Sequence, residues 1–367
     1  MRVIRRPEWL VIAVVCFLCN PGVRQTYSQP PTSSQAASKP TTTRAVRPRL
    51  PKGFASKKIT MPDGSVRKYV IYVPPQYKLN KTHKWPLIVA LHGSGECGND
   101  GVKQTTIGLA PYIVGRPTKF PFIVIFPQAH QLWFRGDEEI AVWLELEATL
   151  RDYRIDPDRI YLTGLSMGGF ATWELGAARP DVFAAIVPIC GAGPLGFMSN
   201  LLNLPIWAFH GALDKNVPVA RSRELIDELK GLGAKPRYTE YPDLEHISWD
   251  AAYATPELWR WLLKQRRPPP PRVIDYSLSS ERANVWWLMA EAEPKPEAPP
   301  HIHAEIGEDG RLSIESKHIV AWAVTGGPGL MQEGMDIDVV WNGHELYRGQ
   351  FNGTIGFRQE AASQPAD

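Results

Sequence analysis

Short apolar runs and helical patterns alternate along the middle of the chain. The apolar runs are nearly continuous, which is typical of strands buried on both faces of a sheet. They cover residues 85–91, 122–126, 159–163, 183–189 and 205–209. Between them the helical patterns are Ile140, Trp143, Leu146 and Leu150, at intervals of three or four, and residues 221–230, which we expect to stop at Gly231. The alternation predicts a doubly wound, mostly parallel α/β sheet.

The segments on either side of this region differ from it. Residues 59–61, the turn signal Pro62-Asp63-Gly64 and residues 67–73 predict an antiparallel start to the sheet. Four consecutive prolines at 268–271 predict an extended spacer. The strand-like runs beyond it are 284–289, 301–306, 311–314, 319–324 and 337–341. Because Asn342-Gly343 is a strong hairpin signal and no helical pattern is visible, we predict a small all-β domain of the sandwich kind.

The amino-terminal residues have the pattern of an export signal. Arginines at positions 2, 5 and 6 precede an uncharged apolar run at 9–19, which is shorter than the roughly 20 residues that span a bilayer. Small residues at Thr26 and Ser28 favour cleavage after Ser28, so we predict a secreted or periplasmic protein; an uncleaved anchor is the alternative. Half of residues 29–50 are Pro, Ser or Thr, a composition typical of a disordered linker.

These patterns divide the chain into six parts. We predict a signal peptide at 1–28, a disordered linker at 29–51 and a catalytic domain at 52–267. The spacer at 268–271, a β-rich domain at 272–358 and a tail at 359–367 follow.

Composition narrows the class of protein. The 367 residues are 44% hydrophobic and 22% charged, with a net charge of +3. That is the profile of a globular protein, and so small a basic excess argues against a nucleic-acid partner. No apolar run after the signal is long enough to hold the chain in a membrane. The cysteines left after cleavage are Cys97 and Cys190, either as two free thiols or as one bridge.

The sharpest motif is Gly164-Leu165-Ser166-Met167-Gly168-Gly169. It stands between the predicted strand 159–163 and a helical stretch at 170–178. Gly-x-Ser-x-Gly in that setting is a nucleophile elbow, a turn so tight that glycines must flank the serine. The turn also places the serine at a helix N-terminus, where free N–H groups favour negative charge. We predict Ser166 as a nucleophile.

A serine nucleophile needs a base, and the base needs a carboxylate. In this kind of fold the chain order is serine, acid, histidine. His210 and His246 are the two histidines between the motif and the prolines, and only His246 follows Asp214, which lies just after an apolar strand. We predict Asp214 as the acid, with Asp243 as the alternative, and His246 as the base. The alternative for His246 is an ordinary surface-loop histidine.

Two N–H donors should stabilise the oxyanion. We assign them to the backbone of Met167, next after the nucleophile, and of Ser94, in the glycine-rich loop 92–96. His92 in that loop is predicted to be structural. Trp133 and Trp249 either form substrate-binding walls or pack in the core. His301 and His303 lack further ligands nearby in the sequence, so no metal or other cofactor is expected.

Residues 57–267 resemble α/β-hydrolase esterases of the poly(3-hydroxybutyrate) depolymerase, feruloyl esterase and prolyl-oligopeptidase-like grouping. The segments that match are 91–96, Pro127-Gln128, 156–169, 210–214 with Val217-Pro218, and 246–249. The resemblance implies an α/β-hydrolase fold with Ser166, Asp214 and His246 as a catalytic triad. It also implies a serine carboxylic-ester hydrolase that forms an acyl-enzyme.

The substrate class follows from the size of one loop. Residues 191–204, where many hydrolases of this fold insert a lid, are too few for a helical cap. We therefore expect an open site for esters that project from larger molecules, such as acyl groups on polysaccharides. The alternatives are a peptidase for short peptides and a catalytically silent binding protein. The tryptophans of the β-rich domain would either stack on sugars or fill its core: Trp286, Trp287, Trp322 and Trp341.

Overall fold

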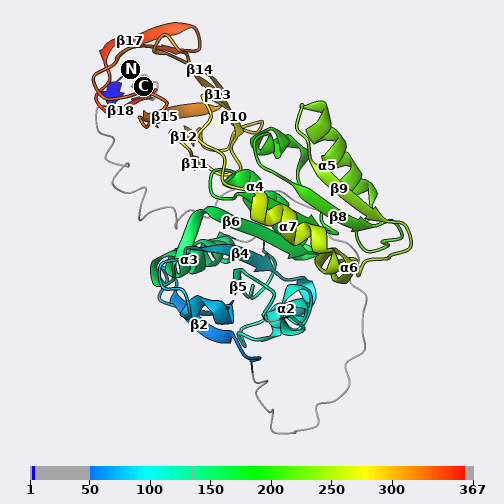
Figure 1. The fold of residues 1–367 in the computed structure, drawn as a ribbon. Coiled ribbons are helices and arrows are strands. Elements are labelled where there is room, and N and C mark those ends of the chain that lie inside the picture. The colour runs from blue at the N-terminus through cyan, green and yellow to red at the C-terminus, as the bar shows by residue number, and fades with distance from the viewer. Residues whose placement is uncertain (1, 5–49, 117, 134–135, 360–367) are drawn as a thin grey trace.

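The computed structural model describes residues 2–4, 50–116, 118–133 and 136–359. Within these residues, eight strands form one sheet in the order β2-β3-β5-β4-β6-β7-β8-β9 (Figure 1). The first two pairings, β2 with β3 and β3 with β5, are antiparallel, and all the others are parallel. The strands are β2 (Phe54–Thr60), β3 (Val66–Tyr72), β4 (Trp85–Leu91), β5 (Ile123–Phe126), β6 (Ile155–Leu165), β7 (Ala185–Ile189), β8 (Trp207–Gly211) and β9 (Arg237–Tyr241).

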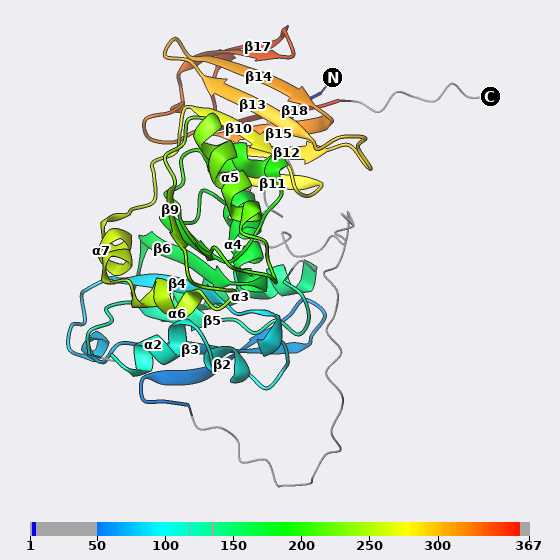
Figure 2. The same ribbon diagram turned by 90° about the vertical axis from the view of Figure 1, so that its right-hand side faces the viewer.

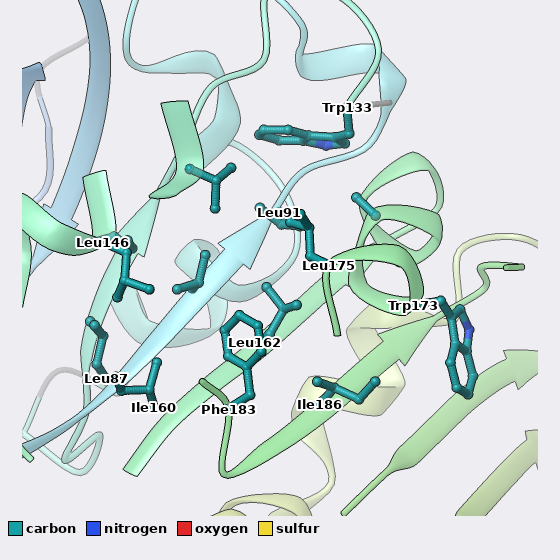
Figure 3. Packing of buried hydrophobic residues seen from close by; sticks show 14 of the residues in the cluster. Leu87, Leu91, Trp133, Leu146, Ile160, Leu162, Trp173, Leu175, Phe183 and Ile186 are labelled. Carbon is teal, nitrogen blue, oxygen red and sulfur yellow. The ribbon is translucent and has the colours of Figure 1, made fainter. Parts of the chain in front are cut away.

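Helices cover both faces of this sheet. One apolar cluster joins the sheet to α3 (Gly136–Asp152), α4 (Met167–Ala178) and α5 (Ala220–Gly231), and Figure 3 shows its packing around the inner strands β4 and β6. A second cluster joins the other face to α2 (Leu109–Val114), α6 (Trp249–Ala254) and α7 (Pro256–Lys264). The four short 3-10 turns are η1 (Pro75–Lys78), η2 (Ser94–Glu96), η3 (Lys103–Thr105) and η4 (Leu195–Leu201). We call residues 50–267 the α/β region.

The predicted layout of the α/β region is confirmed, with shifted ends. Strand β6 extends to both sides of the predicted run 159–163, and α4 begins at Met167 rather than at residue 170. Gly231 is the last residue of α5 and not the stop we predicted. Leu50, placed in the predicted linker, packs against the core. The rest of that linker and most of the predicted signal peptide lie outside the described residues.

Residues 272–359, together with the short strand β1 at residues 2–4, form a β-sandwich. One sheet has the order β1-β18-β15-β12-β11 and the other has the order β10-β13-β14-β16-β17. Their inner faces enclose one apolar cluster, and Figure 2 shows the two sheets stacked at one end of the molecule. The strands are β1 (Arg2–Ile4), β10 (Val273–Ser277), β11 (Arg282–Val285), β12 (Leu288–Ala292), β13 (His301–Ile306), β14 (Arg311–Lys317), β15 (Ile319–Thr325), β16 (Asp336–Trp341), β17 (His344–Gln350) and β18 (Thr354–Arg358).

Two features of the β-sandwich differ from the sequence expectation. The predicted run 284–289 is two strands, β11 and β12, joined by a tight turn in which Trp286 has a positive φ of 50°. Strand β1, which falls in the predicted signal peptide, pairs with β18. The predicted hairpin at Asn342-Gly343 is present, since both residues have positive φ and Trp341 faces His344 across it.

The β-sandwich packs against the C-terminal end of α4. The Asn200 side chain, which is buried, donates to Ala177 O and to Ser277 O and accepts the Ser277 N–H at 2.8 Å. The Tyr276 hydroxyl donates to Ala178 O at 2.8 Å. A cavity of about 730 Å³ lies beside this contact, lined by residues of α3, α4 and the β-sandwich loop 292–300.

Candidate active site

The elbow motif forms a strained turn between β6 and α4. Ser166 has φ 52° and ψ −118°, and its N–H donates to Ile189 O at 3.0 Å. A side chain at Gly164 would place its Cβ 2.2 Å from Gly168 O, and one at Gly168 would lie 2.3 Å from Leu91 O. Backbone therefore occupies the space on both sides of the serine, which is the physical reason for the two glycines in the motif.

Ser166, His246 and Asp214 form a hydrogen-bonded array at the carboxyl edge of the sheet. His246 Nε2 lies 2.9 Å from Ser166 Oγ, and His246 Nδ1 lies 2.7 Å from Asp214 Oδ2. Because a carboxylate only accepts, Nδ1 carries the proton and Nε2 is left to accept the serine hydroxyl. The alternative acid, Asp243, is exposed and lies on the loop before His246. Asp214 is thus the acid that the structure places against the imidazole.

Asp214 is held as an ionised carboxylate. Its side chain has no exposed surface. Burial alone would raise the pKa of Asp214, but hydrogen bonds from His210, His246 and the Val217 N–H outweigh that effect and hold the pKa well below its usual range. Oδ1 accepts the N–H groups of Asn216 and Val217 at 2.8 and 2.9 Å. The carboxylate therefore stays charged, and its orientation is fixed.

The glycine-rich loop passes directly beside the serine. A carbon built on Gly93 would lie 3.6 Å from Ser166 Cβ. Ser94, the predicted oxyanion donor, is exposed and opens the turn η2, while Met167 belongs to the first turn of α4. N–H groups in a first helical turn have no partner within the helix. Met167 adjoins the nucleophile in the chain, and Ser94 follows Gly93, which lies beside the serine. Their role as oxyanion donors stays a prediction.

His92 and Trp133 hold this loop in place through hydrogen bonds. The Ala129 N–H donates to His92 Nε2 at 2.9 Å, so the ring proton lies on Nδ1, which bonds Gly93 O. Burial lowers the pKa of His92 to about 4, which keeps the ring neutral. The Trp133 indole N–H donates to His92 O at 2.9 Å, and Trp133 is buried in the core. Its position favours the packing alternative over a substrate wall.

Trp249 contacts the array and also packs against the second apolar cluster. Its ring stands edge-on to His246, with the ring centroids 5.6 Å apart, and it is half-buried. Ser166 is also half-buried, and the His246 side chain keeps 16% of its surface exposed. Only the short turn η4 fills the loop 191–204. The nucleophile can therefore be approached from solvent.

The two cysteines of the α/β region are free. Cys97 is half-buried and bonds Gln131 O through its thiol. Cys190 is buried beneath the elbow, accepts the Ser166 N–H at 3.3 Å, and burial raises the pKa of its thiol to about 12. Among the described residues, Cys190, Asp214 and His246 are grouped within 4.8 Å as possible metal ligands. Two of these three already bond each other in the array.

Two family models and a solved structure match the α/β region. Residues 67–193 match the family described as esterase PHB depolymerase, and residues 138–254 match phospholipase/carboxylesterase. A solved thermostable esterase superposes with a TM-score of 0.54 at 33% identity, over 59% of this chain and 64% of that one. The chain carries an α/β-hydrolase domain of the esterase type. The β-sandwich follows this hydrolase domain in the chain.

Two of the curated relatives of the hydrolase domain are named as a depolymerase and a feruloyl esterase. Poly(3-hydroxyalkanoate) depolymerase C of Paucimonas lemoignei is 35% identical over 124 residues, which is 30% of this chain and 28% of the relative. Feruloyl esterase D of Neurospora crassa is 25% identical over 47% of this chain and 62% of its own length. The chain thus spans less than two thirds of the length of either relative.

Two further residues of the hydrolase domain were not among the predicted site residues. The Gln128 amide accepts the Gly101 N–H at 2.6 Å and donates to Glu96 O and Asp100, which fastens the loop that carries Ser94. The Pro127-Gln128 pair at the end of a strand was the sequence signal for this role. His210 lies 3.2 Å from Asp214, a contact for which the sequence carries no signal, because every residue of β8 is buried.

Proposed function

We propose that the protein is an exported serine hydrolase that cleaves carboxylic esters, with Ser166 as nucleophile, His246 as general base and Asp214 as its partner. The observation that supports this most directly is the array itself, with hydrogen bonds of 2.9 Å and 2.7 Å in series. The glycine-rich loop beside Ser166 and the esterase relatives add to it. Each group has the partner that its chemical role requires.

The reaction proceeds through an acyl-enzyme. His246 takes the Ser166 proton while Oγ attacks the ester carbonyl, and the N–H groups of Met167 and Ser94 bind the oxyanion. Asp214 stabilises the imidazolium that forms. His246 then gives its proton to the departing alcohol, and water repeats the sequence to release the acid. Each oxyanion donor contributes about 3 kcal/mol of barrier lowering.

The substrates we propose are acyl esters attached to polysaccharides or similarly exposed on a large molecule. Half-burial of Ser166 and the short loop 191–204 support this, because a polymer needs an uncovered nucleophile. Feruloyl esterase D and a bifunctional acetylxylan esterase/xylanase of Neocallimastix patriciarum are relatives whose names carry such substrates. Polyester chains are the second ester class in the relatives' names.

Export rests on the arginines at 2, 5 and 6 and the apolar run 9–19. Among the described residues, no helix is apolar and long enough to cross a bilayer. Expression in a bacterial host, cell fractionation and amino-terminal sequencing test this proposal. We expect the exported product to begin at Gln29. A full-length product retained in cells would contradict export.

The activity test uses purified protein with four substrates: p-nitrophenyl acetate, methyl ferulate, a poly(3-hydroxybutyrate) suspension and a proline-peptide amide. The matched control is Ser166→Ala. We expect turnover of the small esters that falls at least about 10³-fold in the variant. Amide turnover alone would support a peptidase. Equal residual activity in both proteins would support a silent binding protein, and hydrolysis restricted to the polymer would replace the polysaccharide proposal.

A further inference from the structure

The glycine-rich loop beside the nucleophile is held at both of its ends by one residue. The Ala129 N–H donates to His92 Nε2 at 2.9 Å at the start of the loop, and Ala129 O accepts the Gly98 N–H at 2.9 Å just past its end. Ala129 has no exposed surface and lies just after β5. The course of the chain after β5 therefore fixes the loop that carries Ser94.

The neighbours of this residue make the same kind of contact. Gln131 O accepts the Cys97 thiol at 2.7 Å, and the Gln128 amide donates to Glu96 O at 3.2 Å. We call residues 128–133 the support segment. Because these hydrogen bonds are spread along the loop, the loop must move whenever the support segment moves.

The support segment is in turn attached to a buried ion pair. Glu138, in the first turn of α3, accepts the His130 N–H through Oε2 at 3.1 Å. Arg67 on β3 places Nη1 3.2 Å from each oxygen of Glu138, and both side chains are buried. Burial raises the pKa of the nearby Glu145 well above its usual value, so that carboxyl is neutral. Glu138 is left as the partner of the guanidinium.

We propose that Glu138 is a positioning residue for the oxyanion site: it anchors the support segment, and the support segment holds the loop that presents the Ser94 N–H. The inference deepens the proposed function, because it assumes that this N–H binds the oxyanion. Glu138 acts through the support segment and does not touch the substrate. An oxyanion donor is effective only about 2.7 to 3.1 Å from the developing charge, so a small displacement of the loop weakens the hydrogen bond that lowers the barrier.

The first variant combines Arg67→Met with Glu138→Leu in the full-length protein. Apolar side chains of similar size can replace a buried ion pair with little loss of stability, but the His130 N–H loses its acceptor. We expect kcat on p-nitrophenyl acetate to fall at least about 10-fold, and by no more than the roughly 10²- to 10³-fold loss of one whole donor, with KM little changed. Thermal unfolding establishes that the variant is folded at the assay temperature.

A second substrate shows whether the loss arises at the oxyanion. In the thionoester of p-nitrophenyl acetate, sulfur replaces the carbonyl oxygen. Because sulfur is a weak hydrogen-bond acceptor, the turnover of this ester depends little on the two N–H donors. The ratio of the oxygen-ester rate to the thionoester rate should therefore fall in the double variant. An unchanged ratio, whether both rates fall equally or only the melting temperature falls, would mean a merely structural role and overturn the proposal.

Two further variants complete the test. Asp156→Leu with Arg159→Met removes a similar ion pair at the far end of β6, where Asp156 also accepts a backbone N–H. Its rate ratio should stay at the wild-type value, and an equal fall there would overturn the proposal. Glu138→Gln covers a double variant that fails to fold, because the uncharged amide keeps the shape of the side chain. Its ratio should fall by a smaller amount, and an unchanged ratio would overturn the proposal. Wild-type protein that hydrolyses no ester would contradict the proposed function itself, and this inference with it.

Discussion

The two ends of α4 differ in what they contact. At the amino-terminal end, Ser166 has a positive φ, backbone atoms crowd the glycines, and a charged array converges on the serine. At the carboxyl-terminal end, Ala177 and Ala178 accept ordinary hydrogen bonds from Asn200 and Tyr276, and the β-sandwich packs there. Twelve residues separate the ends, or about 18 Å at 1.5 Å per residue.

One helix thus carries the proposed nucleophile at its amino-terminal end and the contact with the β-sandwich at its carboxyl-terminal end. Strain and buried charge are concentrated where a reacting group must be presented, and they cost stability. The far end is assembled from neutral hydrogen bonds and apolar packing, which stabilise without chemical consequence. We therefore expect changes at the amino-terminal end to act on turnover, and changes at the other end to act on stability alone.

The largest expected effect is at the amino-terminal end. Asp214→Asn should lower kcat/KM on p-nitrophenyl acetate about 10⁴-fold, because the amide can no longer hold the imidazole in the required tautomer or stabilise its charge. The control is Asp243→Asn, at the exposed alternative acid, which should retain wild-type turnover. Equal losses of kcat/KM in the two variants would show that Asp214 has no special role at this end of the helix.

Gly168→Ala should affect both stability and turnover. The new Cβ would lie 2.3 Å from Leu91 O and 2.7 Å from His92 O, so the loop that carries Ser94 must move. We expect the free energy of unfolding in urea to fall by about 4 kcal/mol, with the loss of most activity. Gly196→Ala is the control, since nothing lies within 4 Å of its Cβ position. A fully active, stable Gly168→Ala would show that the close approach is unnecessary.

Asn200→Ala tests the carboxyl-terminal end. It leaves Ala177 O and both backbone groups of Ser277 without their side-chain partner in a buried contact. The free energy of unfolding should fall by about 2 kcal/mol, while kcat/KM stays unchanged. The exposed neighbour Asn203→Ala should alter neither. Reduced kcat in Asn200→Ala at temperatures where it is folded would show that the two ends are coupled.

Glu174→Gln tests the middle of α4. Burial, with a contribution from the nearby Glu139 carboxylate, raises the pKa of Glu174 to about 8. The stability from this group is therefore complete below about pH 4.5 and is lost as pH rises through 8. The variant should be more stable than wild type at pH 8 by on the order of 1 kcal/mol, and equal to it at pH 4. Thermal unfolding at the two pH values measures this, with exposed Glu147→Gln as the control.

The amino-terminal end of α4 can be predicted from the sequence because its motif is short and because the serine, the acid and the histidine follow one another in a known chain order. Glycine spacing fixes the elbow over six residues, and chain order selects His246 and Asp214 from few candidates. The assignment of Met167 and Ser94 as oxyanion donors stays a prediction. The contact of His210 with Asp214 could not be predicted, since every residue of β8 is buried and a buried strand does not show which element covers each side chain.

The β-sandwich shows where local patterns fail. The run 284–289 looks like one strand, but Trp286 adopts a positive φ that bulky residues seldom take. Tertiary packing decides this turn, because Trp287 is buried and its indole N–H donates to Pro271 O. Trp322 and Trp341 are likewise buried in the core, 5.9 Å apart and edge-on, rather than arranged as a sugar-binding surface.

The hydroxyl of Tyr276 has a consequence for dissecting the molecule. The last carbonyl groups of any helix point outward without partners of their own. Here the hydroxyl of Tyr276, which lies beyond the proline spacer in the chain, donates a hydrogen bond to Ala178 O. A fragment ending at residue 267 would lose that hydrogen bond and expose the neighbouring apolar surface to water. Separating the two domains would therefore fray the last turn of α4, the helix that follows Ser166.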